Sequence, residues 1–183
     1  MSRTNSLWTG ITAVLLVLAA AESHAEVTAS GPSGFSLKIE LPVTVAPTEA
    51  FRRFLEIGQW WNSEHTYSGK SANLRLESKA GGCFCETLPD GGFVKHMDVV
   101  YSAPGKVLRL AGGLGPLQGM GATGIMGFQF KPEGATTRII LTYTVSGFGT
   151  GKGLAEVALP VEGVLTEQLT RFKRFAETGK PAA

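Results

Sequence analysis

The most regular hydrophobic pattern in the chain lies near its end, from Leu154 to Thr178. Apolar residues there recur at three- and four-residue steps, with charged residues such as Glu156 and Lys173 between them, which predicts a long amphipathic α-helix. We expect Pro160 to kink this helix, because proline removes one backbone donor. A hydrophobic stripe of this width needs a broad apolar partner, and the preceding residues are expected to supply a sheet.

Upstream of this helix, short runs alternate between apolar and polar positions, as β-strands do. The first strand is predicted over residues 35–45, at a sheet edge because Pro42 interrupts it. Two short helices should follow, one opening at Pro47 and one carrying Trp60 and Trp61. Six strands joined by tight turns come next, at Asn73–Ser78, Cys83–Leu88, Phe93–Ser102, Lys106–Gly112, Thr123–Lys131 and Arg138–Val145. This order predicts an α+β fold, a curved antiparallel sheet of about seven strands wrapped around the C-terminal helix.

The N-terminus has the pattern of a secretory signal peptide. Arg3 precedes an uncharged run from Leu7 to Ala21, and Ser23 and Ala25 stand at positions −3 and −1 of a cleavage site after Ala25. The run is shorter than the roughly 20 residues that span a bilayer, so no stable membrane anchor is expected after cleavage. The sequence therefore divides into a signal peptide (1–25), a flexible leader (26–34), one domain (35–179) and a tail (180–183), and the protein is expected to be periplasmic or secreted.

Charge and glycine patterns exclude several partners. The net charge is only +2 and no block of like charge occurs, which argues against nucleic acid and anionic membranes. The segment Ser146–Gly153 departs from a phosphate-binding loop at both ends, so nucleotide binding is rejected. The glycine-rich connection 111–123 carries apolar residues, and it is interpreted either as a mobile lid or as the tip of a β-hairpin.

The two cysteines, Cys83 and Cys85, lie two residues apart on one predicted strand. Residues at this spacing share a face, but their Cβ atoms are too far apart for a disulfide unless a β-bulge intervenes, so no bridge is expected. Two thiols and the imidazole of His96 could bind zinc or form a nucleophile–base pair, yet the spacing is not that of a structural zinc site. No metal, cofactor or catalytic residue is therefore predicted.

The register of the hairpin around these cysteines decides which side chains face inward. A symmetric turn at 89–92 places Cys85 opposite His96 and Cys83 opposite Asp98. It also places Glu86 opposite Lys95 on the solvated face. This register turns both cysteines and His96 inward and leaves Phe84 and Met97 on the outer face. A slip of one residue would reverse the assignment.

Several short motifs, in this order, resemble one known superfamily. They are Ala46–Phe51 at the start of the first helix, Trp60–Trp61, Gly81–Gly82 before a strand, the turn 132–138 and the final helix. From Phe35 to Gly179 the chain resembles the START-like, helix-grip superfamily (SRPBCC), especially its polyketide-cyclase and heat-shock ATPase-activator homologue branch. The resemblance implies a helix-grip fold that binds lipids, hormones, polyketides or other apolar molecules. A few members are cyclases or dehydratases, and no shared catalytic motif exists to transfer.

The strands carry more apolar surface than one helix can cover, which favours an internal cavity between the sheet and the last helix. We expect an exported protein that binds a lipid or another apolar or aromatic small molecule there. The expected lining is Trp61, His65, Tyr67, Cys85, His96, Met120, Phe128, Tyr143 and Phe148. Two alternatives stay open. One is a cyclase or dehydratase that uses His65 or His96 as acid–base, with Tyr67 or Tyr143 polarising a carbonyl. The other is a protein-interaction module in which Trp60–Trp61 and the glycine-rich connection form an exposed patch.

Overall fold

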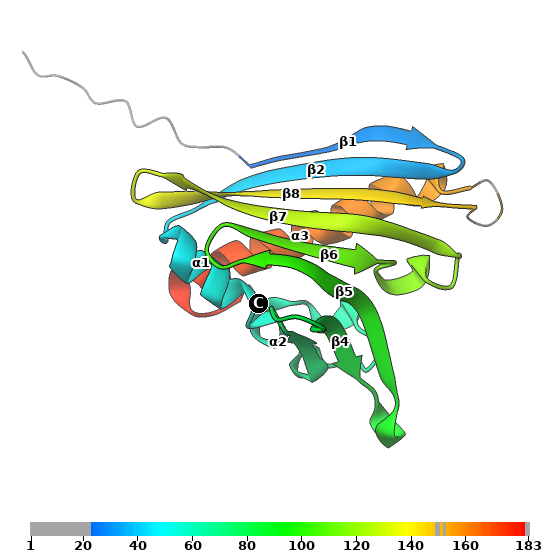
Figure 1. Cartoon of the computed structure of the whole chain (residues 1–183), viewed down its shortest axis with the longest axis horizontal. Helices are drawn as coiled ribbons and strands as arrows, with labels where there is room; N and C mark the ends of the chain where they lie inside the picture. Colours follow the sequence, from blue (N-terminus) through cyan, green and yellow to red (C-terminus); the bar gives the residue numbers. More distant parts are fainter. Residues whose placement is uncertain (1–22, 149–150, 152, 182–183) are drawn as a thin grey trace, which may run out of the picture.

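The computed structural model describes residues 23–148, 151 and 153–181, so most of the predicted signal peptide and the last two tail residues lie outside the described part. The fold is α+β, with one antiparallel sheet curving over a long C-terminal helix (Figure 1). Its strands are β1 (His24–Gly31), β2 (Gly34–Val43), β3 (Leu74–Leu76), β4 (Cys83–Thr87), β5 (Phe93–Ala103), β6 (Val107–Gly112), β7 (Ala122–Glu133) and β8 (Thr136–Gly147). Its α-helices are α1 (Pro47–Phe54), α2 (Ile57–Trp60) and α3 (Ala155–Thr178).

The eight strands form a single sheet in the order β1-β2-β8-β7-β6-β5-β4-β3. Strands β4 to β8 follow one another as a meander. The β4–β5, β5–β6 and β7–β8 connections are short turns at places the sequence predicted, whereas the longer glycine-rich connection joins β6 to β7. The N-terminal strands join this meander through the pairing of β2 with β8, so residues far apart in sequence, such as Leu41 and Ile139, lie side by side.

The residues expected to be a flexible leader form a strand instead. β1 pairs with β2 from the His24–Glu40 pair to the Gly31–Gly34 pair, with one irregularity after Val27. Its side chains are mostly small and polar, so the hydrophobic pattern alone gave no strand signal there. Backbone hydrogen bonding to β2 supplies the order, and the sheet has eight strands where about seven were expected.

The prediction that the first strand lies at an edge is also wrong, because β2 is flanked by β1 and β8. Pro42 is tolerated because it lies beyond the last β1 partner, which is opposite Glu40. At Pro42 the strand is paired only with β8, through Arg138, and the Pro42 carbonyl accepts from Lys173 Nζ. The N and C=O of one strand residue point to the same side, so the missing N–H faces away from β8 and leaves no gap in that ladder.

The core lies between the concave face of the sheet and the three helices. Phe54 of α1 is central to it, and its ring centroid lies 4.6 Å from that of Phe128 and 5.1 Å from that of Phe172. Trp60 packs against the same cluster, and its indole N–H donates to the Phe54 carbonyl at 3.2 Å. α3 continues without a break through Pro160. Aromatic side chains from α1 and α2 thus cover sheet surface that α3 alone does not reach.

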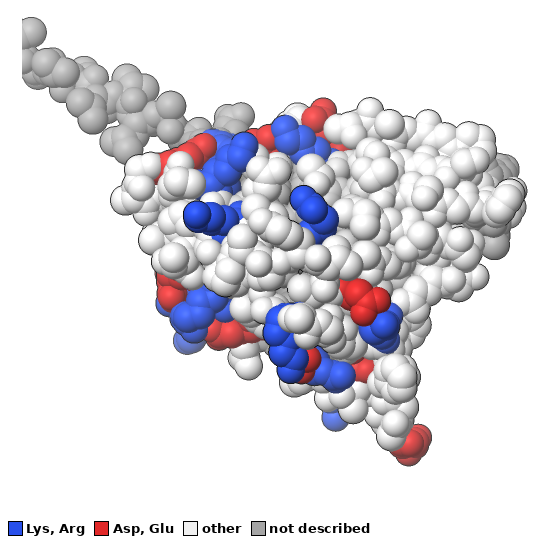
Figure 2. All heavy atoms as spheres, viewed as in Figure 1, with Lys and Arg blue, Asp and Glu red and all other residues white. Residues whose placement is uncertain are grey.

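Charged side chains are unevenly spread on the outer face of the sheet. Figure 2 shows them gathered near the end where α1, α2 and the β4–β5 hairpin lie, while the opposite end carries almost none. Within residues 23–148, 151 and 153–181, no helix is long and apolar enough to cross a membrane.

Candidate functional site

An open cleft of about 340 Å³ lies at one end of the domain. The segment after α2, strands β4 and β5, the connection between β6 and β7, and α3 all contribute to its walls. The apolar lining consists of Trp61, Tyr67, Phe84, Leu114, Gly115, Pro116 and Val164. The polar lining consists of Glu64, His65, Thr66 and His96. This volume lies within the range of about 300–1,000 Å³ that is usual for small-molecule sites.

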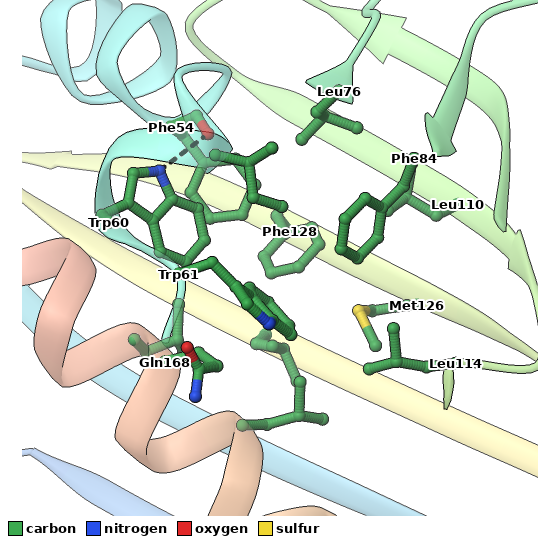
Figure 3. Close-up of a pocket in the computed structure, with 14 residues that line it drawn as sticks. Phe54, Trp60, Trp61, Leu76, Phe84, Leu110, Leu114, Met126, Phe128 and Gln168 are labelled. Carbon is green, nitrogen blue, oxygen red and sulfur yellow. Dashed lines mark hydrogen bonds between the residues drawn. The ribbon is translucent and has the colours of Figure 1, made fainter. Parts of the chain in front are cut away.

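Trp61 forms the boundary between the cleft and the core. Its indole N–H donates to the His65 carbonyl at 3.0 Å, and its ring lies edge-on to Phe84 with centroids 5.4 Å apart. Trp61, Phe84 and Leu114 line both the cleft and a second, inner cavity (Figure 3). These three side chains therefore separate the two spaces.

The inner cavity, between the sheet and α3, measures only about 20 Å³. That is room for about one water-sized sphere. The large internal cavity expected from the sequence is therefore absent from the described part of the chain. The excess apolar surface of the strands is covered by the α1 and α2 aromatics, and Phe128 faces the small remaining space (Figure 3).

The glycine-rich connection between β6 and β7 forms one wall of the cleft through Leu114, Gly115 and Pro116. Tyr143 of β8 anchors this wall from within the core. Its hydroxyl donates to the Gly112 carbonyl and accepts from the Leu114 N–H, both at 3.1 Å. Burial raises the pKa of Tyr143 to about 12. Both hydrogen-bonding roles of the hydroxyl are thus used for structure.

Glu86 and His96 form a buried pair in the wall of the cleft. His96 Nε2 lies 3.0 Å from Glu86 Oε2, and the carboxylate also accepts from the backbone N–H groups of Tyr67 and Ser68, at 3.2 and 2.5 Å. Burial opposes ionisation of Glu86, but these hydrogen bonds outweigh it and hold the pKa of the carboxyl below its ordinary value. For His96, burial dominates over the carboxylate and lowers the pKa of the imidazole.

The register of the β4–β5 hairpin differs from the symmetric register expected from the sequence, and as a result Glu86 is buried. The turn takes in Leu88, so Glu86 lies opposite Val94 rather than Lys95, and the predicted solvated pair is wrong. A register shift then leaves His96 as an extra residue on β5 and restores the predicted pairing of Cys83 with Asp98.

The same shift corrects the assignment of the two strand faces. Phe84 and Met97, expected to point outward, are buried in the core, and Phe84 lines the cleft. Cys83 and Cys85 project from the other face of β4 and are joined by a disulfide, with Cα atoms 5.5 Å apart. The bridge, which was not expected without a β-bulge, is present where the β4–β5 pairing is irregular, between Phe84 and Cys85.

A second histidine–carboxylate pair lies on the helix side of the cleft. His65 Nε2 is 3.0 Å from Glu167 Oε2 of α3, and the Asn62 side-chain amide donates to the other carboxylate oxygen at 2.6 Å. The backbone N–H of Asn62 donates to Gln168 at 2.8 Å. Burial opposes ionisation of Glu167, but the hydrogen bonds from Asn62 and His65 hold its pKa below the ordinary value. These bonds fasten the segment after α2 to α3.

The structure divides the nine predicted lining residues into three groups. Trp61, His65, Tyr67 and His96 line the cleft, and Phe128 lines the inner cavity. The other four line neither space: Cys85 is bonded to Cys83, Met120 packs against the core, Tyr143 is buried beneath the wall, and Phe148 is 99% exposed. The exposed Trp60–Trp61 patch of the interaction-module hypothesis is absent, since both side chains are buried.

Sequence reasoning missed Phe84 and Glu86, because both depend on the hairpin register. It also missed Leu114 and Pro116, although they belong to the glycine-rich connection that had been singled out. The signal available in the sequence was Phe84 and Met97 themselves, two large apolar side chains that the expected register left on the outer face. Across the part of the chain that the structure describes, no three His, Cys, Asp or Glu side chains are grouped to hold a metal ion.

Comparisons with known proteins show the fold. No family model matches the sequence, and no curated protein matches it. Among solved structures, the chain is similar to EF2215 from Enterococcus faecalis, a conserved protein of unknown function, with a TM-score of 0.60 and 17% identity over 88% of this chain and 80% of that one. CalU16 from Micromonospora echinospora gives a TM-score of 0.57 and 14% identity over 90% and 88% of the two chains. DynU16, a protein in the dynemicin biosynthetic locus, gives a TM-score of 0.53 and 18% identity over 80% of this chain and 48% of that one. The chain thus shares with these proteins a fold in which a curved sheet packs on a C-terminal helix.

Proposed function

We propose that the protein binds a small, mainly apolar molecule in the open cleft beside Trp61, outside the cytoplasm. The observation that carries this proposal is the lining of the cleft: aromatic and aliphatic side chains form most of the wall, and a few polar groups converge on it. Small-molecule sites usually combine apolar walls with a few oriented polar groups. Tyr67, Trp61 and Phe84 offer ring faces or edges to a flat ligand.

The site differs from the one expected between the sheet and the last helix. The inner cavity is too small for an organic ligand, so the ligand occupies the cleft and reaches inward only as far as Trp61, Phe84 and Leu114. Export is supported by the signal-peptide pattern and by the Cys83–Cys85 disulfide, because disulfides persist in oxidising compartments.

Binding can be tested with the neutral apolar dye N-phenyl-1-naphthylamine. Trp60 and Trp61 are close to the cleft, so a dye bound there should quench their emission by energy transfer as its own emission rises. The informative variant is Val164→Phe, which places a ring in the cleft from α3. Its matched control is Leu159→Phe on the same helix, where the side chain is 70% exposed and does not line the cleft.

We expect the wild type and Leu159→Phe to bind the dye equally and Val164→Phe to bind at least about tenfold more weakly, a difference of about 1.4 kcal/mol. Equal binding by all three proteins would place the dye elsewhere and refute the assignment of the cleft. Absence of saturable binding to the wild type would refute the proposed function for apolar aromatic ligands.

A further inference from the structure

The Glu86–His96 pair has a backbone arrangement that a regular hairpin would not produce. His96 is the extra residue of the β5 irregularity, between Lys95 and Met97, which pair with successive residues of β4. His96 and Met97 are consequently both buried, whereas neighbouring residues of a regular strand point to opposite faces. Irregularities of this kind often re-aim a side chain beside a functional site.

Two neighbouring residues hold the irregularity in place. The Gln118 side-chain amide donates to the carbonyls of Lys95 and His96, at 2.6 and 3.2 Å. Gly112 of β6 passes so close that a Cβ there would lie 2.8 Å from the His96 carbonyl oxygen. The backbone around His96 is therefore held by Gln118 of the β6–β7 connection and by the close approach of Gly112 on β6.

The hydrogen bonds fix the tautomer of the imidazole. An ionised carboxylate only accepts hydrogen bonds, so His96 Nε2 must carry the proton that it shares with Glu86. The neutral ring then has a lone pair on Nδ1. That atom is buried and has no hydrogen-bond partner within the described residues. A buried acceptor without a partner costs free energy, and functional sites are where such an exception is expected.

Two aromatic rings hold His96 in the cleft wall. Phe84 lies beneath it with centroids 4.8 Å apart, and Tyr67 stacks on it at 6.0 Å and 24°. Tyr67 is 57% exposed and belongs to the irregular segment before β3, so it is the side chain that a molecule entering the cleft would displace to reach the ring.

We infer that His96, oriented by Glu86, is a general base that takes a proton through Nδ1 from the molecule bound in the cleft. This inference rests on the proposed binding function. The ligand class is an apolar molecule with a hydroxyl group or with a C–H next to a carbonyl. In the first step the ligand O–H or C–H bond breaks, its electron pair stays on the ligand, and an N–H bond forms at Nδ1. The Glu86 carboxylate stabilises the imidazolium, and the proton then returns to another atom of the ligand, which restores the neutral ring.

The base can be tested without knowledge of the natural ligand by using 5-nitrobenzisoxazole, a flat apolar probe. A base removes the C3–H proton of its isoxazole ring, the electron pair of that C–H bond completes the carbon–nitrogen triple bond of a nitrile, and the N–O bond breaks to give a coloured phenolate. General bases contribute about 10²–10⁴-fold, so we expect His96→Gln to lower the rate by at least about 100-fold. Lys131→Gln is the control, because Lys131 is exposed on β7 and does not line the cleft.

The pH profile is a second signature of the same base. The rate should rise with pH through a single inflection below the ordinary histidine pKa of 6.5, since burial lowers the pKa of His96. The other titratable groups in the cleft walls are Glu64, His65 and Tyr67, with Glu86 and Glu167 behind the two histidines. The exposed Lys95–Asp98 ion pair flanks His96 on β5. Loss of the inflection in His96→Gln, and its retention in Lys131→Gln, assigns it to His96.

The outcomes separate this inference from the proposed function. If the dye binds but elimination does not depend on His96, the general-base role is overturned and the binding function stands. If the protein neither binds the dye nor catalyses the elimination, both the binding function and the general-base role are overturned. If His96→Gln does not fold, ¹⁵N NMR of the wild-type imidazole decides: a proton on Nε2 and none on Nδ1 is the expected tautomer, and the reverse tautomer overturns the inference.

Discussion

The wall of the cleft should depend on one buried hydroxyl group. Tyr143→Phe keeps the ring and removes only the oxygen that bridges the Gly112 carbonyl and the Leu114 N–H. A net protein hydrogen bond contributes about 0.5–1.5 kcal/mol, so the loss of two predicts about 1–3 kcal/mol of destabilisation. In a domain of this size, that corresponds to a fall of about 2–12 °C in Tm, at about 2–4 °C per kcal/mol.

Urea unfolding followed by tryptophan fluorescence measures this change directly. Hydrogen exchange at the Leu114 amide adds a local readout, because its N–H should exchange faster in Tyr143→Phe while the amides of β8 stay protected. Tyr67→Phe is the matched control: the Tyr67 hydroxyl forms no hydrogen bond within the described residues, and its removal should change the free energy of unfolding by less than about 0.5 kcal/mol. A Tyr143→Phe protein as stable as this control, with unchanged exchange at Leu114, would refute the assignment of Tyr143 as the anchor of the wall.

Three further predictions concern the cleft and the strand behind it. Trp61→Ala should join the cleft to the inner cavity, cost about 3–5 kcal/mol of stability and change dye affinity, which thermal melts and dye titrations measure. Acidification should destabilise the protein. The pKa of His96 is lower in the folded state, so the stability that this group contributes is complete above pH 6.5 and is lost as the pH falls below that value. The pKa of Glu86 is also lower in the folded state, which adds a second loss of stability below pH 4.5. Urea unfolding at a series of pH values should show that the free energy of unfolding changes less with pH in His96→Gln than in the wild type above pH 4.5. Replacement of both Cys83 and Cys85 by serine should cost only about 1.5 kcal/mol by urea unfolding, because the closed loop is so short.

Much of the sheet could be predicted from the sequence, because its strands alternate cleanly and end at glycine-containing turns. β5 was predicted over Phe93–Ser102 and extends over Phe93–Ala103, and the last helix was predicted one residue longer than α3. Periodicity identifies these elements because each buries one face. β1 was missed for the converse reason: it is an edge strand of small polar residues and is ordered by backbone pairing.

The site could be predicted only in part, because its geometry depends on two details that no periodicity encodes. One is the inclusion of Leu88 in the turn, which moves Glu86 from a solvated position to a buried one. The other is the extra residue at His96, which brings the imidazole to that carboxylate. Trp61 and Tyr67, which were expected to line a cavity between the sheet and the last helix, line the cleft instead, where a short helix and a loop position them locally. The near absence of an inner cavity could not be predicted, because it depends on how α1 and α2 pack on the sheet.

The disulfide between Cys83 and Cys85 also bears on how the chain is made. Cysteines separated by one residue are neighbours even in the unfolded chain, so their bond can form before the sheet assembles. Since the sequence has only two cysteines, only one intramolecular disulfide can form, and oxidative folding requires no rearrangement of incorrect disulfides. The one misbonded product is a linkage between two chains, and dilution during oxidation should be enough to avoid it.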